Sequence, residues 1–360
     1  MKILVTGGLG FIGSAVIRRA LAMTGHEILN IDKITYAASE AALAEAARHP
    51  RYAFFRADIT DGAAVRACFQ RFQPDAVMHL AAETHVDRSI DGPALFVRTN
   101  ILGSFALLEA AREYYAGLPA HRREQFRFHH VSTDEVFGSL EPDDPAFDET
   151  TRYDPRSPYS ASKAAADHLA RAWMHSYGLP VIVSNTCNNY GPWQFPEKFI
   201  PLVLINALLE LPLPVYGDGG NVRDWLYVED HAEALLKVVE RGVPGQTYCI
   251  GASQPRRNLD VARQICAILD ARLPSRDGPR ERLIRLVSDR PGHDRRYEID
   301  PRAAGQALDW RAAHDFTRGL DATIDWYLAH RDWWEEIRRA RYRGERLGAG
   351  QGGAGQGEAA

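Results

Sequence analysis

The sequence predicts an α/β protein with a doubly wound parallel sheet and a smaller mixed α/β lobe. From the N-terminus, short apolar runs such as ILVTG and EILNID alternate with amphipathic helical segments. Strands that alternate with helices of this length form right-handed crossovers and a sheet covered on both faces. After residue 190 this alternation breaks into segments punctuated by proline and glycine. With 360 residues, 45% of them hydrophobic, the chain can bury the cores of two lobes.

Each predicted element rests on its own apolar pattern. Strands are expected where short apolar runs lie between turn residues, and helices where apolar residues recur every three or four positions. In the first 190 residues this rule predicts strands at 2–7, 27–32, 52–59, 76–84, 126–133 and 180–186, and helices at 11–23, 40–49, 63–72, 93–115 and 160–177. Later it predicts helices at 198–211 and 228–240 and short strands at 246–251 and 295–300.

These elements divide the chain into two parts and a tail. Residues 1–190 are expected to form a dinucleotide-binding Rossmann domain, and residues 191–330 mainly a substrate-binding lobe. The glycine-rich stretch 348–360 has too few apolar residues to offset the entropy of ordering it, so we predict a disordered tail.

Composition narrows the classes of partner. The formal net charge of −4 gives no overall basic surface for nucleic acid, so an anionic partner should be small. The cysteines are widely spaced and predict buried free thiols rather than a zinc or redox site: Cys68, Cys187, Cys249 and Cys266. The apolar run after Phe199 is interrupted by Asn206, Glu210 and prolines, and the N-terminus lacks a signal-peptide core. We expect a soluble cytoplasmic protein without a membrane span.

The run VTGGLGFIG predicts a dinucleotide site. It places Gly7, Gly10 and Gly13 between the first strand and the first helix, where glycines allow a pyrophosphate to approach the helix N-terminus. Asp32 ends the second strand at the offset where an acid receives a ribose 2′-hydroxyl. Because a carboxylate there repels a 2′-phosphate, the pattern favours NAD over NADP.

The segment YSASK places Tyr159 and Lys163 four residues apart on a predicted helix, hence on one face. An ammonium group beside a phenol favours the phenolate, so we expect Lys163 to lower the pKa of Tyr159. Tyr159 would then accept a hydroxyl proton while a hydride leaves the same carbon.

The run HHVSTDEVFG places two adjacent carboxylates, Asp134 and Glu135, at the end of a buried strand. If their environments differ, one can stay ionised while the other holds a proton, and the pair then supplies a base and an acid. The alternative is that both merely solvate or cap the strand end. Their place beyond the carboxyl end of a parallel strand favours the chemical role.

The chain resembles the dTDP-glucose 4,6-dehydratase family, in the nucleotide-sugar branch of the extended short-chain dehydrogenase/reductase superfamily. The matching motifs are TGGLGFIGS, HLAAETHVDRS, STDEVFG, YSASK, SNTCNNYGP and GDGGNVRDWLYVEDH, together with the position of Asp32. They extend from Met1 to about Trp326, and although each is short, together they are specific. One departure is Phe137, where relatives commonly carry tyrosine. We expect the phenylalanine ring to be accommodated by packing against its neighbours.

The resemblance implies a lyase that dehydrates dTDP-glucose to dTDP-4-keto-6-deoxyglucose. Such enzymes oxidise C4 with bound NAD, eliminate water across C5 and C6 and return the hydride to C6. The implied acid is Asp134 and the implied base is Glu135. Thr133 would form a hydrogen bond with the C4 oxygen beside Tyr159. The full catalytic set is then Thr133, Asp134, Glu135, Tyr159 and Lys163.

The resemblance also implies cofactor and substrate contacts. For NAD these are Gly7, Gly10, Phe11, Ile12, Gly13, Asp32, Lys33, Thr35, Asp58, Ile59, Leu80, Ala81, Ala82, Thr84, Thr99, Tyr159, Lys163 and Asn189. For the nucleotide sugar they are Thr84, Thr133, Asn188, Lys198, Phe199, Pro214, Val215, Tyr216, Arg223, Asn258, Asp289 and His293. Arg223 offers a guanidinium group that can form two hydrogen bonds to one phosphate. For His293, a role as an ordinary surface histidine is supported as well as a role in binding.

Other functions stay open at this point. They are another enzyme of the branch, such as a CDP-glucose 4,6-dehydratase, a UDP-sugar 4-epimerase or a decarboxylase, and a non-catalytic NAD-sensing protein. The acid pair argues against an epimerase, which eliminates nothing, and the complete catalytic set argues against a sensor. A homodimer is implied, formed by the helix that carries Tyr159 and the helix near 100–115. Leu107, Leu108 and Ala111 fit that interface, although an intramolecular helix contact would give the same pattern.

Overall fold

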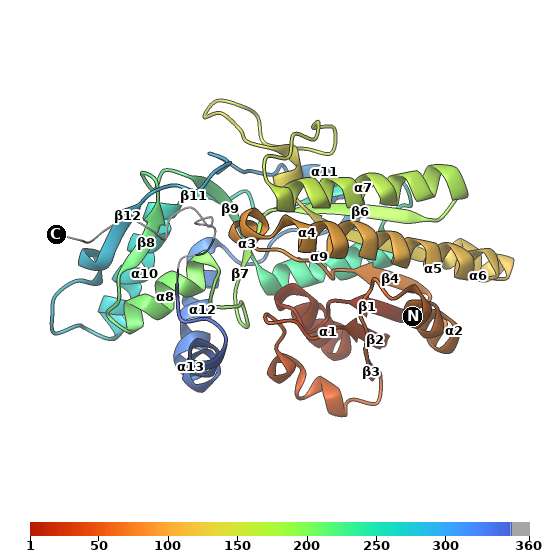
Figure 1. Cartoon of the computed structure of the whole chain (residues 1–360), viewed down its shortest axis with the longest axis horizontal. Helices are drawn as coiled ribbons and strands as arrows, with labels where there is room; N and C mark the ends of the chain where they lie inside the picture. Colours follow the sequence, from red (N-terminus) through yellow and green to blue (C-terminus); the bar gives the residue numbers. More distant parts are fainter. Residues whose placement is uncertain (346, 348–360) are drawn as a thin grey trace, which may run out of the picture.

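The computed structural model describes residues 1–345 and 347. The tail predicted at 348–360 lies outside the described residues. The larger of two lobes holds a seven-stranded sheet, and the smaller lobe lies beyond the carboxyl edge of that sheet (Figure 1).

The larger lobe contains most of the first 190 residues and one later crossover. Its strands are β1 Lys2–Thr6, β2 Glu27–Asp32, β3 Tyr52–Arg56, β4 Ala76–His79, β5 Arg127–Thr133, β6 Val181–Thr186 and β10 Thr247–Ile250. Its helices are α1 Phe11–Met23, α2 Gly62–Phe72, α3 Val86–Asp91, α4 Pro93–Phe96, α5 Ser104–Ala116, α6 Ala120–Gln125, α7 Pro158–Tyr177, α9 Val228–Arg241 and α11 Arg302–Leu308. Shorter turns are η1 Glu40–Leu43, η2 Ala46–Arg48, the π-helical η3 Val97–Gly103 and η4 Asp134–Phe137.

All strands of the large sheet run parallel, in the order β10-β6-β5-β4-β1-β2-β3. The direction of winding reverses around β1, whose neighbours are β2 and β4. In such sheets a crevice opens at the carboxyl ends of the strands at this reversal, and ligands bind there.

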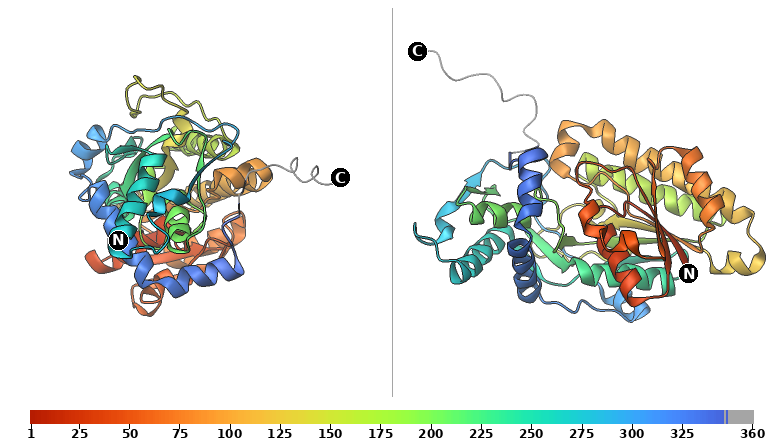
Figure 2. Two further views of the ribbon diagram at one scale, coloured as in Figure 1. Left: turned by 90° about the vertical axis from the view of Figure 1, so that its left-hand side faces the viewer. Right: turned by 90° about the horizontal axis from the view of Figure 1, so that it is seen from below.

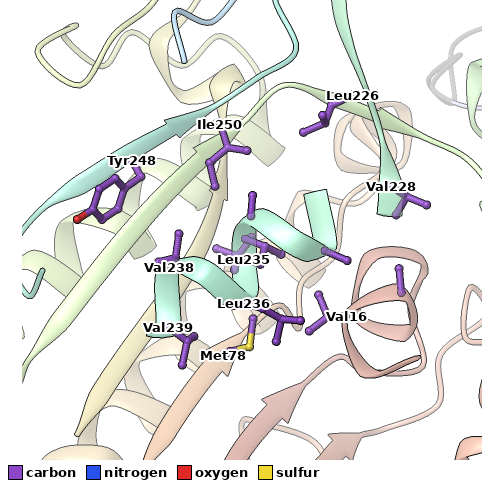
Figure 3. Close-up of a cluster of buried hydrophobic side chains, with 14 of the residues drawn as sticks. Val16, Met78, Leu226, Val228, Leu235, Leu236, Val238, Val239, Tyr248 and Ile250 are labelled. Carbon is purple, nitrogen blue, oxygen red and sulfur yellow. The ribbon is translucent and has the colours of Figure 1, made fainter. Parts of the chain in front are cut away.

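Two apolar cores cover the two faces of this sheet. On one face α1 packs against α9, and Val16, Met78, Leu235 and Val238 are fully buried (Figure 3). On the other face α2, α5 and α7 cover the strands through a second buried cluster. Burial on both faces explains why the strands read as continuous apolar runs rather than as alternating patterns.

The smaller lobe has a core of its own around α8. Its elements are β7 Asn188–Tyr190, α8 Phe199–Leu208, β8 Leu213–Tyr216, β9 Val222–Tyr227, β11 Pro255–Arg257, α10 Asn258–Arg272, η5 Arg280–Leu283, β12 Ile284–Val287, α12 Phe316–Ala329 and α13 Arg331–Ala340. They include a β11-β9-β7 sheet and a β12-β8 pair. The blue C-terminal ribbon lies between the two lobes (Figure 2).

Three expectations about elements were wrong. The strand expected at 246–251 is present as β10, but it was expected in the smaller lobe and instead joins the large sheet, where it pairs with β6 after the α9 crossover. The segment 40–49 forms two 3₁₀ turns instead of one helix, since Pro50 limits the helix to little more than two turns and nucleation of so short a helix is costly. The segment 295–300 makes only the isolated bridges of Arg296 with Val222 and Ile299 with Phe147.

Other expectations can be compared directly with the structure. All four cysteines are free and buried, and Phe137 packs against the rings of Phe147 and Tyr153. In the described part of the chain one helical stretch, Pro93–Ala116, is long and apolar enough to cross a membrane by length and composition. Half of its most apolar window is buried in this fold, where the stretch packs against α2 and α7.

Candidate active site

A cavity opens at the carboxyl edge of the large sheet and reaches the smaller lobe. Its walls come from the turn after β1, the ends of β2, β4, β5 and β6, the start of α7 and the segment 186–198. Residues far apart in sequence meet there because parallel strands present their carboxyl ends at one edge.

The glycine turn fits a pyrophosphate. Gly7 has φ +74, and a Cβ there would stand 2.7 Å from the backbone of Ala81. A Cβ on Gly13 would stand 2.3 Å from the carbonyl oxygen of Gly7. Gly10, the N-cap of α1, gives no side-chain cap, so the first N–H groups of the helix stay available to an anion. These residues fit a dinucleotide such as NAD.

Asp32 is nearly buried at the end of β2 and lines the cavity. Its two carboxylate oxygens accept the backbone N–H groups of Leu9 at 3.0 Å and of Ile34 at 2.8 Å. Burial raises the pKa of Asp32, and these two hydrogen bonds oppose the rise. A carboxylate keeps further lone pairs after two such bonds, so Asp32 can still receive a ribose hydroxyl.

The other residues expected to hold the cofactor lie mostly along the same cavity. Asp58 is the exception, because its carboxylate accepts from Thr60 and lies 3.7 Å from Lys33 outside the cavity wall. The cavity is lined by Gly7, Gly10, Phe11, Ile12, Gly13, Lys33, Thr35, Ile59, Leu80, Ala81, Ala82, Thr84, Thr99 and Asn189.

The acid pair lies where β5 ends and η4 begins. Asp134 is 1% exposed and stays outside the cavity wall, whereas the partly exposed Glu135 lines it. The hydroxyl of Thr133 donates to Asp134 Oδ1 at 3.3 Å and accepts the N–H of Glu135. Oδ2 of Asp134 has no hydrogen-bond partner within the described structure. The two adjacent carboxyl groups therefore lie in different surroundings.

The surroundings separate the two acids electrostatically. Burial, followed by the charge of Glu135, raises the pKa of Asp134 well above its ordinary value. Burial also raises the pKa of Glu135, but Arg290, Lys198 and Arg223 oppose that rise. The arrangement favours Asp134 as the group that holds a proton and Glu135 as the group that ionises.

Tyr159 and Lys163 begin α7, which Ser157 caps in a reciprocal capping box with Ser160. Both line the cavity. The expectation that Lys163 lowers the pKa of Tyr159 was wrong for this structure: burial, followed by the charge of Glu135, raises it well above the ordinary value. Lys163 directs its Nζ to the carbonyl oxygen of Val131 at 2.8 Å, and burial lowers its own pKa. Ionisation of Tyr159 therefore needs positive charge beyond that of Lys163.

The residues expected to bind substrate fall into two groups. Thr84, Thr133, Asn188 and Lys198 line the cavity. The remainder lie outside its wall: Phe199, Pro214, Val215, Tyr216, Arg223, Asn258, Asp289 and His293.

Burial explains part of this second group. Val215 is 1% exposed in the core of the smaller lobe, and Phe199 stacks on Trp225, so both serve packing. Arg223 is buried, donates to the carbonyl oxygens of Val222 and Asp294, and lies over the ring of Tyr297. Its charge still reaches both members of the acid pair.

The end of the expected base pocket contains a hydrogen-bonded histidine and an unpaired amide oxygen. Nδ1–H of His293 donates to Asp289 Oδ1 at 2.5 Å, and burial lowers the pKa of His293 to about 4. Asn258 begins α10, and its Oδ1 is buried without a hydrogen-bond partner in the described chain. That orphaned oxygen suits a donor on a ligand.

Sequence reasoning missed several residues of the site. Arg290, which lies in the segment between the expected Asp289 and His293 but was assigned no contact of its own, pairs with Asp87 at 2.9 Å and joins the two lobes. Glu197, also in the wall, pairs with Arg88 at 2.8 Å. Gln194 lines the cavity, and its Oε1 lacks a hydrogen-bond partner among the described residues. Their presence in or beside the quoted motifs was the available signal.

No metal centre is indicated: within residues 1–345 and 347, the structure contains no group of three or more histidine, cysteine or acidic side chains arranged to hold an ion.

The chain was compared with known proteins. A family model described as GDP-mannose 4,6 dehydratase matches residues 4–323. A dTDP-glucose 4,6-dehydratase of Escherichia coli is 54% identical over 97% of this chain and 99% of its own. One from Neisseria meningitidis is 53% identical with the same coverage.

Solved structures agree with these matches. The dTDP-glucose 4,6-dehydratase of Streptomyces venezuelae, solved with NAD bound, aligns with a TM-score of 0.84 and 39% identity over 94% of this chain and 100% of its own. The UDP-glucose 4-epimerase of Thermus thermophilus, also with NAD, aligns with a TM-score of 0.80 and 30% identity over 92% and 100%. The fold is thus shared by both enzyme classes, and the residues of the site must distinguish them.

The raised pKa of Asp134 predicts how Asp134→Asn changes stability with pH. The pKa of Asp134 in the folded protein lies above its ordinary value of 3.8. The folded protein therefore becomes less stable as the pH rises from about 3.8 towards the folded pKa, because the buried carboxyl group has to ionise. Asparagine has no charge to desolvate. The stability of the variant relative to the native protein should therefore be greater at about pH 8 than at about pH 5. Thermal unfolding at both values measures this gain.

The matched control is Asp143→Asn, at an exposed position. It should show no such pH-dependent gain. If Asp134→Asn has the same stability relative to the native protein at both pH values, Asp134 is not held in its protonated form.

Proposed function

The chain belongs to the GDP-mannose 4,6-dehydratase family, and we infer that it catalyses the NAD-dependent dehydration of dTDP-glucose to dTDP-4-keto-6-deoxyglucose. It is a hydro-lyase, since the sugar loses water and no net oxidation results. The single observation that carries this inference is the unequal burial of Asp134 and Glu135 beside Tyr159 in one cavity.

That observation separates dehydration from epimerisation. An epimerase removes a hydride at C4 and returns it, which requires a base for the C4 hydroxyl but no second acid and base. Elimination of water needs a base at C5 and an acid at the C6 hydroxyl, and the two groups must differ in protonation. Asp134 and Glu135 meet this requirement because burial and nearby cations act on them to different extents.

Each residue of the site has a separate role in the proposed reaction. Tyr159 takes the proton of the C4 hydroxyl, with Thr133 bonded to the same oxygen, and Lys163 orients the site. A bound NAD would supply the acceptor for the hydride from C4 and the donor of that hydride to C6. Glu135 takes the C5 proton once C4 is a ketone, and it returns a proton to C5 when the hydride adds at C6. Asp134 gives its proton to the C6 hydroxyl, which leaves as water.

The charge around Tyr159 supports this order. Tyr159 is hard to ionise in the protein alone, because burial and Glu135 oppose the phenolate. The oxidised nicotinamide ring is positively charged, so a bound cofactor supplies the charge that favours ionisation when it is needed.

The smaller lobe supplies the site for the nucleotide diphosphate. Positive charge lies near Glu135, because the charges of Arg290, Lys198 and Arg223 all lower its pKa. Cations grouped this way suit a diphosphate, with Asn188 and Asn258 offering orphaned amide oxygens to hydroxyl or imide donors. Thymine as the base rests on the relatives, whose names give dTDP-glucose.

The protein is proposed to form a homodimer through α5 and α7. Leu107, Leu108 and Ala111, once expected at the interface, are fully buried inside the monomer and are not available to it. The exposed apolar residues on these helices are different ones. Phe105 is 43% exposed, touches Trp173 edge-on, and Trp173 in turn contacts the 52% exposed Tyr177.

The free buried cysteines fit a reducing compartment, and we place the enzyme in the cytoplasm with its nucleotide-sugar substrate.

The first test presents purified protein with dTDP-, UDP- and CDP-glucose without added NAD. Product analysis should show the 4-keto-6-deoxy sugar from dTDP-glucose at the highest rate, because the bound cofactor is regenerated in each cycle. Formation of only a C4 epimer, or turnover of none of the three, would overturn the inference.

Glu135→Gln should separate oxidation from elimination. Glutamine cannot take the C5 proton, so dehydration should slow about 10²–10⁴-fold, the usual contribution of a general base. Oxidation at C4 continues, and reduced nicotinamide should accumulate, visible in near-ultraviolet absorbance after mixing with dTDP-glucose.

The exposed Glu141→Gln is the control and should behave like the native enzyme. A Glu135→Gln variant that dehydrates at the native rate would remove Glu135 from the role of base.

Phe105→Glu tests the dimer. A carboxylate in an apolar interface is costly to desolvate, so sedimentation should change from dimer to monomer mass. Leu286→Glu, at a 58% exposed leucine of the smaller lobe, should leave the mass unchanged. A native protein that sediments as a monomer would contradict the proposal.

A further inference from the structure

The C-terminal helix α13 lies against the loop that follows β2, far from its own position in the chain. We infer that this contact retains the cofactor, with Trp333 and Arg341 as positioning residues for NAD that act through the loop 33–39. The inference rests on the proposed function, because only a reaction that returns its hydride requires the same cofactor molecule to stay bound.

Two side chains of the C-terminal segment bond the loop directly. Arg341 donates from Nη1 to the carbonyl oxygens of Ala38 at 3.0 Å and Tyr36 at 3.4 Å. Trp333 donates from Nε1 to the hydroxyl of Ser39 at 3.1 Å.

An apolar cluster fills the space between these hydrogen bonds. Ile337 and Tyr342 pack with Phe195 of the smaller lobe, and Tyr36 and Ala37 of the loop lie against them. The loop thus meets α13 through its backbone and through its side chains.

The loop forms part of the cavity wall. Asp32 directly precedes it, and Thr35, Ala37 and Ala38 line the cavity. The N–H of Ser39 donates to the carbonyl oxygen of Leu9 at 2.9 Å, which joins the loop to the glycine turn. A shift of this loop would therefore move both the acid expected at the ribose and the turn expected at the pyrophosphate.

The backbone of the loop is strained and needs to be held. Ile34 has φ +62, a conformation that β-branched residues rarely adopt. Its N–H is bonded to Asp32 Oδ1, so relaxation of Ile34 would release the carboxylate. Strain of this kind persists only where surrounding contacts hold the backbone in place. Ile34 itself packs against the core of the larger lobe, and the C-terminal segment holds the residues that follow it, Tyr36, Ala38 and Ser39.

A second set of contacts links the loop to the smaller lobe. The hydroxyl of Tyr36 donates to Glu197 Oε1 at 2.7 Å, and Arg88 donates to Glu197 Oε2 at 2.8 Å. Arg88 also lies over the Tyr36 ring at 4.2 Å. The loop is therefore held from the side of the smaller lobe as well as by α13.

Retention matters because the hydride taken from C4 must return to C6 of the same sugar. If the reduced cofactor left before the return, the enzyme would be left without a hydride to return, and the oxidised sugar could not be reduced at C6. A slow release of NAD is therefore a requirement of the chemistry, and the α13 contact meets it without touching the reacting atoms.

The test is the rate at which NAD leaves the purified holoenzyme, measured without substrate by exchange with labelled NAD. Arg341→Ala should raise this rate about tenfold, the factor that corresponds to about 1.4 kcal/mol. Lysine can donate to one of the two carbonyl oxygens, so Arg341→Lys should release NAD at a rate between those of the native enzyme and of Arg341→Ala. Added NAD should restore the turnover number of Arg341→Ala, because the catalytic groups are unchanged.

Arg339→Ala is the matched control, since Arg339 is exposed on the same helix. Ser39→Ala removes the acceptor of Trp333 from the loop side with little risk to folding, and it should also speed release. Unchanged release in both Arg341→Ala and Ser39→Ala, with unchanged melting temperature, would overturn the inference. Because release is measured without a sugar, failure of the proposed dehydration would not change this readout.

Discussion

Parallel pairing of β1, β4, β5 and β6 is the constraint on which the site depends. It brings the carboxyl ends of four strands to one edge, so that each short loop there carries one part of the site. The glycine turn follows β1, the segment 80–84 follows β4, the acid pair follows β5, and Asn188 and Asn189 come shortly after β6. This arrangement places the dinucleotide turn and the pair of carboxyl groups at the same edge of the sheet.

Burial is the means by which similar groups acquire different tasks at this edge. Asp134 lies behind the cavity wall and Glu135 in it. Desolvation raises the pKa of Asp134 against the charge of Arg223 and the hydrogen bond of Thr133, and it raises the pKa of Glu135 against the charges of Arg290, Lys198 and Arg223. Burial, followed by the charge of Glu135, likewise raises the pKa of Tyr159 well above its ordinary value. Burial and nearby charges thus act on two carboxyl groups and one phenol at the same edge of the sheet to different extents.

The two lobes are held together by polar contacts close to the site. Asp87 accepts from both Arg290 and Tyr216, and Glu197 joins Arg88 and Tyr36. Because α9 and β10 return to the large sheet, the chain passes between the lobes more than once. Such interleaving favours a fixed cleft over lobes that move freely on a single linker.

The sequence by itself determined the fold class, the glycine turn, the position of Asp32 and the candidate roles of Asp134, Glu135, Tyr159 and Lys163. These features depend on local spacing, and spacing is visible in one dimension. Tertiary structure decided what depends on burial and on distant charges: the raised pKa of Tyr159, the withdrawal of Val215 and Leu107 into cores, and the ion pairs of Arg290 and Glu197. It also decided that β10 joins the large sheet and that α13 returns to the loop after β2, because such long-range contacts are made only when the chain closes on itself.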